Sequence, residues 1–177
     1  VQANVKRIAC VGYTHPDDEW FRRDTIFENP YSNEVAFAEL SNGMSIRFAE
    51  LRRVAGRNYE GVEQLIGTEG HFVQPTDAFA MWSPRHAKEP QTLKPEEMRD
   101  SFPPEVQNAY KNDKGVSIYG GHQGSHAFLV HEFVDAVANG RAPINNAWQA
   151  ARMLAPGVIA HKSAKRDGEW MQVPDWD

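Results

Sequence analysis

Apolar and polar residues alternate along several short runs in the first half of this chain, and apolar residues recur at helical spacing in its last third. Short alternating or β-branched runs bounded by turn-forming residues predict strands, and a repeat of three to four residues predicts amphipathic helices. The runs that predict strands are residues 7–13, 34–41, 44–51, 61–67, 71–74, 77–82 and 168–176. Because most of the turns between them are short, the predicted sheet is mainly antiparallel.

The pair Asn42 and Gly43 separates two of these runs. Asn-Gly is favoured in a two-residue type I′ turn, because both positions of that turn need a positive φ. Such a turn places Ser41 opposite Met44 and fixes the register of the hairpin. The residues then predicted to share the face toward the helices are Val35, Phe37, Met44, Ile46 and Phe48. The other face is too mixed for a core, so we expect it to contact another domain or subunit.

The charged, proline-rich stretch 83–114 predicts a surface excursion with one helical turn near residues 103–110. Two helices follow, over about 125–139 and about 146–164, with Gly140 as the stop of the first and Pro156 as a kink in the second. Apolar residues at helical spacing are Phe128, Leu129, Phe133, Val134 and Val137 in the first helix, and Trp148, Ala151, Leu154, Val158 and Ile159 in the second. We expect the second set to face inward.

These elements predict an α+β fold, a two-layer α/β arrangement in which an open, mainly antiparallel sheet packs helices on one face. At 177 residues the chain fits one domain, 1–177, and is long enough to bury a substantial core. Its first residue is Val1, and a strand-like run follows almost at once. We therefore expect the chain to be part of a longer protein.

The amino-acid composition indicates which kinds of binding partner and which cellular location to expect for this chain. Hydrophobic residues make up 41% and charged residues 24% of the chain, as in globular domains. The formal charge of −5 shows no basic excess, so we expect no nucleic acid as partner. No apolar segment approaches the roughly 20 residues that span a bilayer, and no signal peptide is evident, so we expect no membrane association and a cytoplasmic protein. The single Cys10 excludes an internal disulfide and fits a reducing compartment.

Two charged groups are interpreted as surface features. Asp17, Asp18 and Glu19 are expected to form a solvated turn. The second group could pair with an anion, but exposed ion pairs with nearby glutamates are the simpler interpretation. It consists of Arg47, Arg52, Arg53 and Arg57.

The strongest chemical signal lies in residues 117–137, SIYGGHQGSHAFLVHEFVDAV, where a glycine-rich turn leads into a helix. A strand, a glycine turn and a helix start can hold a pyrophosphate, because free N–H groups and the helix dipole point at the anion. Gly120, Gly121 and Gly124 do not form G-x-G-x-x-G, however, and another helix follows instead of a strand. Dinucleotide binding by this turn is therefore disfavoured.

The histidines of this stretch allow other chemistry. His122 and His126 are four residues apart, but Ser125 suggests that the helix begins between them, and no carboxylate has metalloprotease spacing. Ser125 beside His126 is no evidence for a nucleophile and its base, because no G-x-S-x-G elbow is present. Two interpretations stay open. The histidines could simply be polar residues at the start of a helix, or they could face a substrate that another domain supplies together with its cofactor.

A family resemblance that extends over nearly the whole chain rests on three segments: FENPYSNEVAFAELSNGMSIRFAELRRV, LIGTEGHF and GGHQGSHAFLVHEFVDAVANGRAPINNAWQAARMLAPGVIAHKSAKRDGEWMQVPDW. In succession they resemble the C-terminal half of the glucose-fructose oxidoreductase, inositol dehydrogenase and rhizopine-catabolism protein family (Gfo/Idh/MocA). The last segment is the most specific, because its helix pair, the proline in its second helix and its final VPDW look like the closing elements of the family.

The resemblance implies an N-terminal Rossmann domain that binds NAD or NADP, followed by a C-terminal α/β domain with an open sheet. In many members the uncovered sheet face makes subunit contacts, which implies a homo-oligomer here. Family substrates are sugars, inositols and related polyols, which are oxidised by hydride transfer. The resemblance therefore implies that this chain is the C-terminal substrate and oligomerisation domain of a two-domain NAD(P)-dependent oxidoreductase.

The chain departs from the family because it lacks a Rossmann fingerprint, an E-K-P motif with its catalytic lysine, and the Asp/Tyr-x-x-x-His pair. We therefore expect the chain alone to be inactive, with no catalytic residue, no bound cofactor and no metal. His122 and His126 are candidates for the substrate cleft between the domains, on position alone. Rival hypotheses are a non-catalytic module that dimerises or binds a sugar, part of an NAD-dependent glycosidase, and a metal hydrolase built on the histidines.

Overall fold

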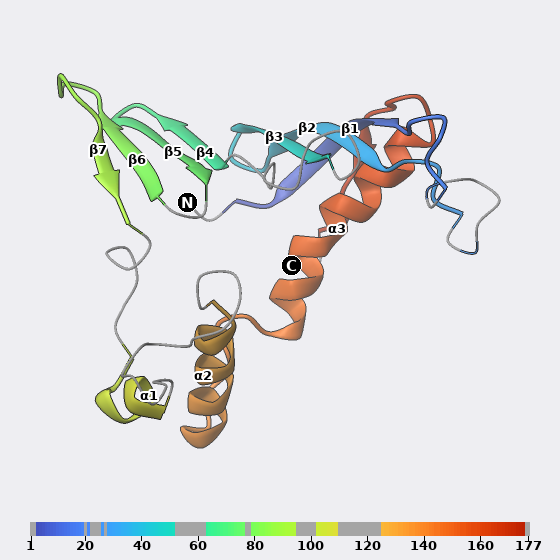
Figure 1. The fold of residues 1–177 in the computed structure, drawn as a ribbon. Coiled ribbons are helices and arrows are strands. Elements are labelled where there is room, and N and C mark those ends of the chain that lie inside the picture. Colours follow the sequence, from blue (N-terminus) through green and yellow to red (C-terminus); the bar gives the residue numbers. More distant parts are fainter. Residues whose placement is uncertain are drawn as a thin grey trace. The chain divides into compact units, whose positions relative to one another are not determined.

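The computed structural model describes residues 3–19, 21, 26, 28–51, 63–76, 79–94, 102–109 and 125–175. The chain divides into two compact units (Figure 1). The first unit consists of Val1–Glu60 and Asn145–Asp177, and the second of Gly61–Ile144.

A four-stranded antiparallel sheet forms one layer of the first unit, with the strand order β3-β2-β1-β8. Its strands are β1 (Val5–Tyr13), β2 (Asn33–Leu40), β3 (Ser45–Leu51) and β8 (Met171–Gln172). Their positions confirm the predicted strands, although β8 is much shorter than the run that predicted it. The sheet therefore joins the beginning of the chain to its end.

The register predicted for the β2–β3 hairpin is wrong by one residue. The backbone N–H of Leu40 donates to the carbonyl of Met44 at 2.8 Å, and Glu39 lies opposite Ser45, so the loop has three residues, 41–43. Gly43 has a φ of 83°, whereas Asn42 is not among the residues with positive φ, as a type I′ turn would require. This is the pattern of a type I turn that ends in a left-handed glycine, the usual three-residue hairpin loop.

The face of β2 that packs inward is also the opposite of the predicted one. Ala36 and Ala38 are 4% and 2% exposed, whereas Phe37 is 59% exposed. Alternation along the strand places the alanines on one face and Phe37 on the other. The prediction was wrong because it took the larger apolar residues for the core, while the small alanines let a helix lie close to the sheet.

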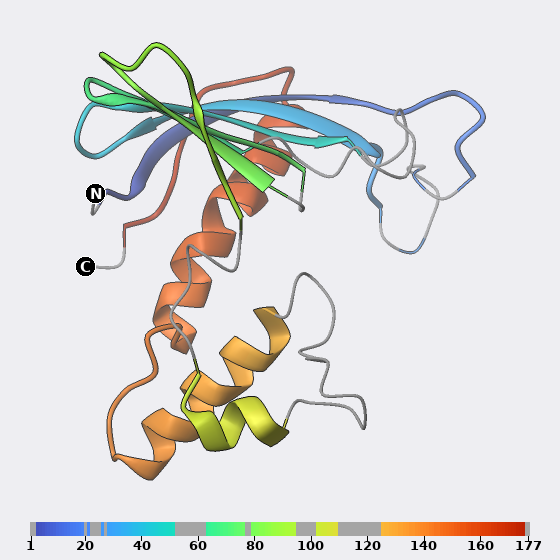
Figure 2. The same cartoon turned by 60° about the vertical axis from the view of Figure 1, so that its left-hand side comes forward.

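That helix is α3 (Ala147–Ala164), which lies against β1, β2 and β8 on one face of the sheet (Figures 1 and 2). Asn146 caps it: its side-chain oxygen accepts from the backbone N–H groups of Trp148 and Gln149, both at 3.1 Å. The residues that α3 buries are Ala155, Pro156, Ile159, Ala160, Ser163 and Ala164. Together with Ile8 and Cys10 of β1, most of them form the core of the unit.

The inward residues predicted for α3 are only partly right. Ile159 is buried, but Trp148, Leu154 and Val158 are 70%, 69% and 55% exposed. Apolar residues occur around much of this helix, so the sequence pattern could not single out the face that meets the sheet.

Polar contacts also tie α3 to the sheet. The Ser163 hydroxyl accepts from the backbone N–H of Cys10 at 2.9 Å and donates to the carbonyl of Glu169 at 2.6 Å. Nδ1 of His161 lies 2.6 Å from a carboxylate oxygen of Glu34, and the edge of its ring meets Tyr31. Because β1 and β2 each contribute partners, these contacts fix the position of the helix along the strands.

Two expectations about charged residues are tested in this unit. Asp18 is 6% exposed, and its carboxylate accepts from the backbone N–H of Phe21 at 3.2 Å, so a fully solvated turn is wrong for this residue. Glu39, one of the glutamates that the second charged group was expected to balance, pairs with Arg7, whose Nε lies 2.7 Å from the carboxylate. In that group only Arg47 lies within the described residues, where it is exposed.

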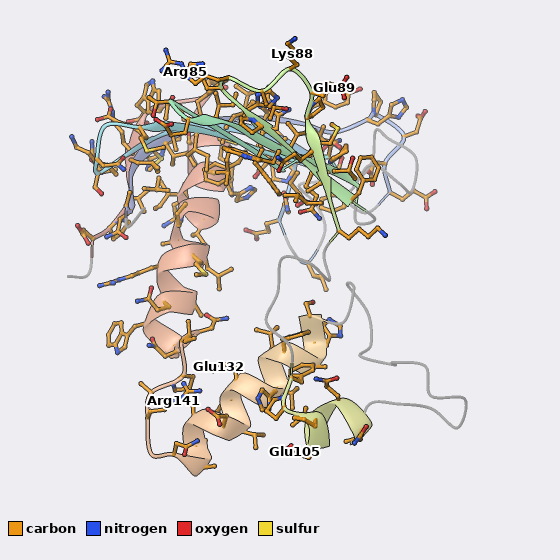
Figure 3. The ribbon with its side chains drawn as sticks, turned by 90° about the vertical axis from the view of Figure 1, so that its left-hand side faces the viewer. Arg85, Lys88, Glu89, Glu105, Glu132 and Arg141 are labelled. Atoms are coloured by element: carbon orange, nitrogen blue, oxygen red, sulfur yellow. The ribbon has the colours of Figure 1, made fainter. Side chains whose placement is uncertain are left out.

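The described part of the second unit contains a four-stranded antiparallel sheet with the order β4-β5-β6-β7. Its strands are β4 (Glu63–Gly67), β5 (Gly70–Thr76), β6 (Phe79–Pro84) and β7 (Gln91–Leu93). The first three were predicted, but β7 was not, because three residues are too few to show alternation. Arg85, Lys88 and Glu89 lie in the turn between β6 and β7 (Figure 3).

The described part of the second unit also contains two helices, α1 (Pro104–Ala109) and α2 (Ser125–Ala138). Both were predicted, and Gly140 ends the second with a φ of 63°. Phe102, which is 4% exposed, stacks on Phe128 with a centroid separation of 3.9 Å. Helices and antiparallel sheets together confirm the α+β fold class.

Candidate functional site

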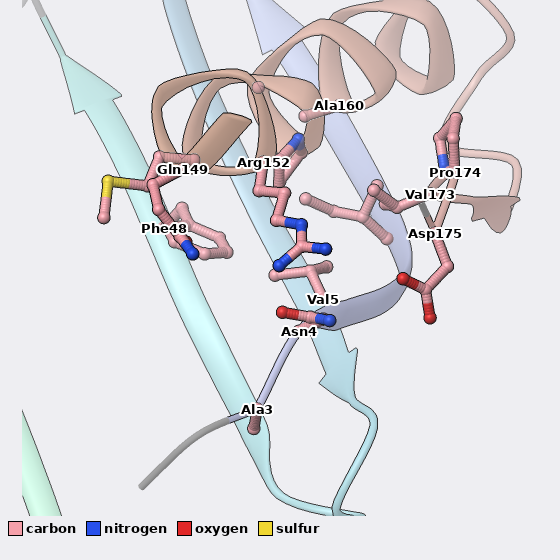
Figure 4. Close-up of a pocket in the computed structure, with 14 residues that line it drawn as sticks. Ala3, Asn4, Val5, Phe48, Gln149, Arg152, Ala160, Val173, Pro174 and Asp175 are labelled. Atoms are coloured by element: carbon pink, nitrogen blue, oxygen red, sulfur yellow. The ribbon is translucent and has the colours of Figure 1, made fainter. Parts of the chain in front are cut away.

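The described residues of the first unit line an open pocket of about 490 Å³ beside α3 (Figure 4), here called the α3 pocket. Its walls come from the start of β1, from β3, from one side of α3 and from the segment after β8. The lining residues are Ala3, Asn4, Val5, Ile8, Phe48, Gln149, Arg152, Met153, Pro156, Gly157, Ala160, Val173, Pro174 and Asp175. Most are apolar, and this volume lies within the usual range of small-molecule sites, about 300–1,000 Å³.

The helical wall of this pocket follows from residue spacing. The positions 149, 152, 153, 156, 157 and 160 recur every three to four residues, so they share one side of α3. Gly157 leaves this side open, because a Cβ at that position would meet nothing within 4 Å. A glycine inside a helix costs roughly 0.5–1 kcal/mol relative to alanine, so the open space is obtained at the expense of helix stability.

Arg152 is the main charged group of the pocket. Its side chain leaves α3 and extends across the pocket toward Asn4 and Val5 (Figure 4). The side chain is partly buried, whereas Asp175, the other charged lining residue, is exposed. A guanidinium in apolar surroundings can pair with a planar carboxylate through two parallel hydrogen bonds. Sequence reasoning missed this site, and the only local signal was a glycine after the proline within a helix.

The histidines singled out by sequence are not brought together in the described residues. His122 lies outside them, so its place in a substrate cleft stays a prediction. His126 is exposed on the first turn of α2, which begins at Ser125 as expected. His131, the third histidine of the stretch, packs edge-on against Phe102 with a centroid separation of 5.2 Å.

The Cys10 side chain is buried in the core of the first unit. Burial raises the pKa of the Cys10 thiol to about 11, with the nearby carboxylate of Glu34 acting in the same direction. The thiol is therefore protonated at neutral pH and unsuited to act as a nucleophile.

No cluster of three or more metal-binding side chains occurs among the described residues. None of the helices in the described ranges combines the length and apolar character that crossing a membrane would need.

The segment after α2 is held by an ion-pair network around Arg141 (Figure 3). Its guanidinium contacts Glu132 through two hydrogen bonds, at 2.8 and 2.7 Å, and Asp135 at 2.6 Å. The Glu132 carboxylate also accepts from the backbone N–H of Ile144 at 2.8 Å. These hydrogen bonds, with that from Arg141 as the largest cause, lower the pKa of Glu132 to about 2.

This pKa gives a prediction for acid titration. Because the folded-state pKa of Glu132 is depressed from 4.5 to about 2, its stabilising contribution is present above pH 4.5 and is lost as the pH falls toward 2. We expect Arg141→Met to return the Glu132 pKa toward 4.5, as measured by carbon NMR of the carboxylate. Arg85→Met, at the β6–β7 turn, is the control and should leave the titration of Glu132 unchanged. An unaltered Glu132 pKa in Arg141→Met would contradict the network.

Comparison with known proteins gives a clear result only at the level of structure. No family model matches the chain, and no curated protein matches it in sequence. Levoglucosan dehydrogenase in complex with NADH and levoglucosan is 15% identical, with a TM-score of 0.70 over 97% of this chain and 45% of that chain. An NAD-binding oxidoreductase from Klebsiella pneumoniae is 14% identical, with a TM-score of 0.70 over 97% of this chain and 46% of that chain.

An inositol dehydrogenase homologue from Azotobacter vinelandii, complexed with NAD⁺, is 16% identical, with a TM-score of 0.61 over 96% of this chain and 43% of that chain. At such low identity these comparisons show a shared fold. This chain therefore has the fold of part of these oxidoreductases, as the sequence resemblance predicted. It spans less than half the length of the proteins it matches.

Proposed function

We propose that this chain is the C-terminal domain of a two-domain NAD(P)-dependent oxidoreductase of the Gfo/Idh/MocA type, acting on a sugar, an inositol or a related polyol. The observation that carries the proposal is the match of 97% of this chain to 45% of levoglucosan dehydrogenase, at a TM-score of 0.70. The structure of that protein contains NADH and levoglucosan, and a structure of an inositol dehydrogenase homologue contains NADH and myo-inositol. Both pair a nicotinamide cofactor with a polyhydroxylated substrate.

In the proposed protein another domain supplies the nucleotide site and the catalytic lysine. The glycine-rich turn of this chain, residues 120–124, lies outside the described residues. The cofactor, when bound to its own domain, supplies hydride chemistry. The residues of this chain would complete the substrate cleft, with His122 and His126 as the candidates.

Exposed apolar side chains support a longer, assembled protein. Trp148, Met153 and Leu154 of α3 are 70%, 71% and 69% exposed. Val11 and Phe37, 63% and 59% exposed, lie on the sheet face opposite α3, where Val11 pairs with Val35 and Phe37 pairs with Ala9. Large exposed apolar patches are uncommon on proteins that work as isolated monomers. We propose that the sheet face opposite α3 is a contact between copies of the chain.

A second candidate, favoured by that same exposed sheet face, is a non-catalytic module that dimerises or binds a sugar. The length and the nucleotide binding of the native polypeptide discriminate between the oxidoreductase and the non-catalytic module. The oxidoreductase proposal expects a native polypeptide longer by about one domain, roughly 100–200 residues, that binds NAD or NADP and reduces it with a sugar or inositol. The 177-residue chain is the matched control and should show neither activity.

A native form of only this length that binds no nucleotide would overturn the proposal and leave the binding module. Release of free sugar without net turnover of the cofactor would instead identify an NAD-dependent glycosidase. In the longer form, we expect His122→Ala and His126→Ala to raise KM for the polyol. His86→Ala, in the exposed β6–β7 turn, is the control for both. An unchanged KM in both variants would remove these histidines from the cleft.

A further inference from the structure

We propose that the α3 pocket is a binding site for a small carboxylate with an apolar body, such as a medium-chain fatty acid. The residues that line this pocket all belong to the first unit and include neither His122 nor His126. The proposal does not depend on the identity of the parent enzyme.

The lining of the pocket argues against a sugar as its occupant. Val5, Ile8, Phe48 and Val173 contribute apolar surface, and polar side chains come from only four of the lining residues. Each hydroxyl of a buried polyol would need a hydrogen-bond partner, and an unpartnered hydroxyl costs about 1–3 kcal/mol on the scale of protein mutations. An alkyl or aryl chain has no such requirement and gains free energy from the apolar area that it buries.

Arg152 determines the charge of the proposed ligand. Its guanidinium extends into the pocket from the wall that α3 provides (Figure 4). The pairing of this group with a carboxylate is stronger beside apolar side chains than in water, because the local dielectric constant is lower. Asp175 is exposed, so water screens its charge more than it screens that of Arg152. The pocket therefore favours an anion over a cation.

Gly157 provides the room that the apolar body of the ligand needs. A side chain at this position would meet no other atom within 4 Å of its Cβ, and the residue lines the pocket. Replacement of Gly157 by leucine should therefore fill the pocket without a clash at Cβ. It should also raise the local helix propensity, because leucine is a better helix former than glycine. A blocked pocket can thus be made without unfolding the protein.

The experiment is a calorimetric titration of the 177-residue chain with octanoate and with octanamide, which share a chain length and differ in charge. We expect octanoate to bind at least about tenfold more tightly than octanamide, a difference of about 1.4 kcal/mol. Arg152→Met should lower the octanoate affinity to that of octanamide and leave the octanamide affinity within about threefold. Gly157→Leu should abolish the binding of both compounds.

Two matched variants control for charge and bulk. Arg166→Met removes an exposed arginine after α3, and Ala147→Leu places the same leucine side chain at the exposed start of the helix. Both variants should bind octanoate as the unmodified chain does. Absence of saturable octanoate binding, equal binding of the two probes, or binding that survives Gly157→Leu would each overturn the proposal. Binding that is seen in this chain but lost in a longer native form would also overturn it, because further polypeptide would then occupy the pocket.

Discussion

Replacement of Ile8 by alanine is expected to lower the free energy of unfolding by about 2–5 kcal/mol, the range for removing most of a buried isoleucine side chain. Ile8 is 1% exposed, and it lies in the middle of β1 within the core that joins the sheet to α3. The measurement is urea denaturation followed by circular dichroism at a fixed protein concentration.

The control for this variant is Ile66→Ala, which removes the same atoms from a side chain that is 79% exposed. A surface substitution of this kind usually changes stability by less than about 0.5 kcal/mol. Equal effects of the two substitutions would show that the assignment of Ile8 to the core is wrong. A large effect of Ile8→Ala alone would confirm that α3 packs on the face of the sheet that carries the small alanines.

Gly70→Ala should be the most damaging substitution in the β4–β5 hairpin. Gly70 has a φ of 154°, and a Cβ there would lie 2.4 Å from the carbonyl oxygen of Ser83, a backbone atom of the neighbouring strand. The backbone conformation alone costs an alanine about 1–3 kcal/mol, and the clash adds to this because β6 would have to move. We expect the amides of β5 and β6 to lose protection from hydrogen exchange.

Gly67→Ala, at the other end of the same turn, provides the comparison. A Cβ at Gly67 would approach no atom closer than 3.8 Å, and its backbone does not require a positive φ. This variant should keep the protection pattern of the unmodified chain. If both glycine variants behaved alike, the close approach of β5 and β6 at Gly70 would be disproved.

The candidate pocket was beyond the reach of sequence reasoning. Its lining comes from four separate parts of the chain, the segment 3–8, Phe48, the segment 149–160 and the segment 173–175. Each part looks ordinary by itself, because a strand start, a strand interior, an apolar helix and a proline-containing tail occur in many proteins. The pocket exists only once β1 pairs with β8 and α3 packs on the sheet.

The sequence by itself determined where most of the described strands and helices occur and where several of them end. Gly140 stops α2 and Asn146 caps α3 because the conformation and hydrogen bonds at those positions depend on residues only a few places away. The position of the β2–β3 hairpin and the α+β class followed from the same local information. For the same reason the resemblance to an oxidoreductase domain could be recognised from short segments and found again in the fold.

The tertiary structure decided the hairpin register, the buried face of β2 and the buried face of α3. Asn-Gly is compatible with loops of two or three residues, and the structure has the longer loop, in which Ala36 and Ala38 pack beneath α3. The free energy that selects a face comes from contacts between residues more than a hundred positions apart. One example is the hydrogen bond from the Cys10 backbone to Ser163. Such contacts have no signature in the local pattern, because each partner alone fits several arrangements.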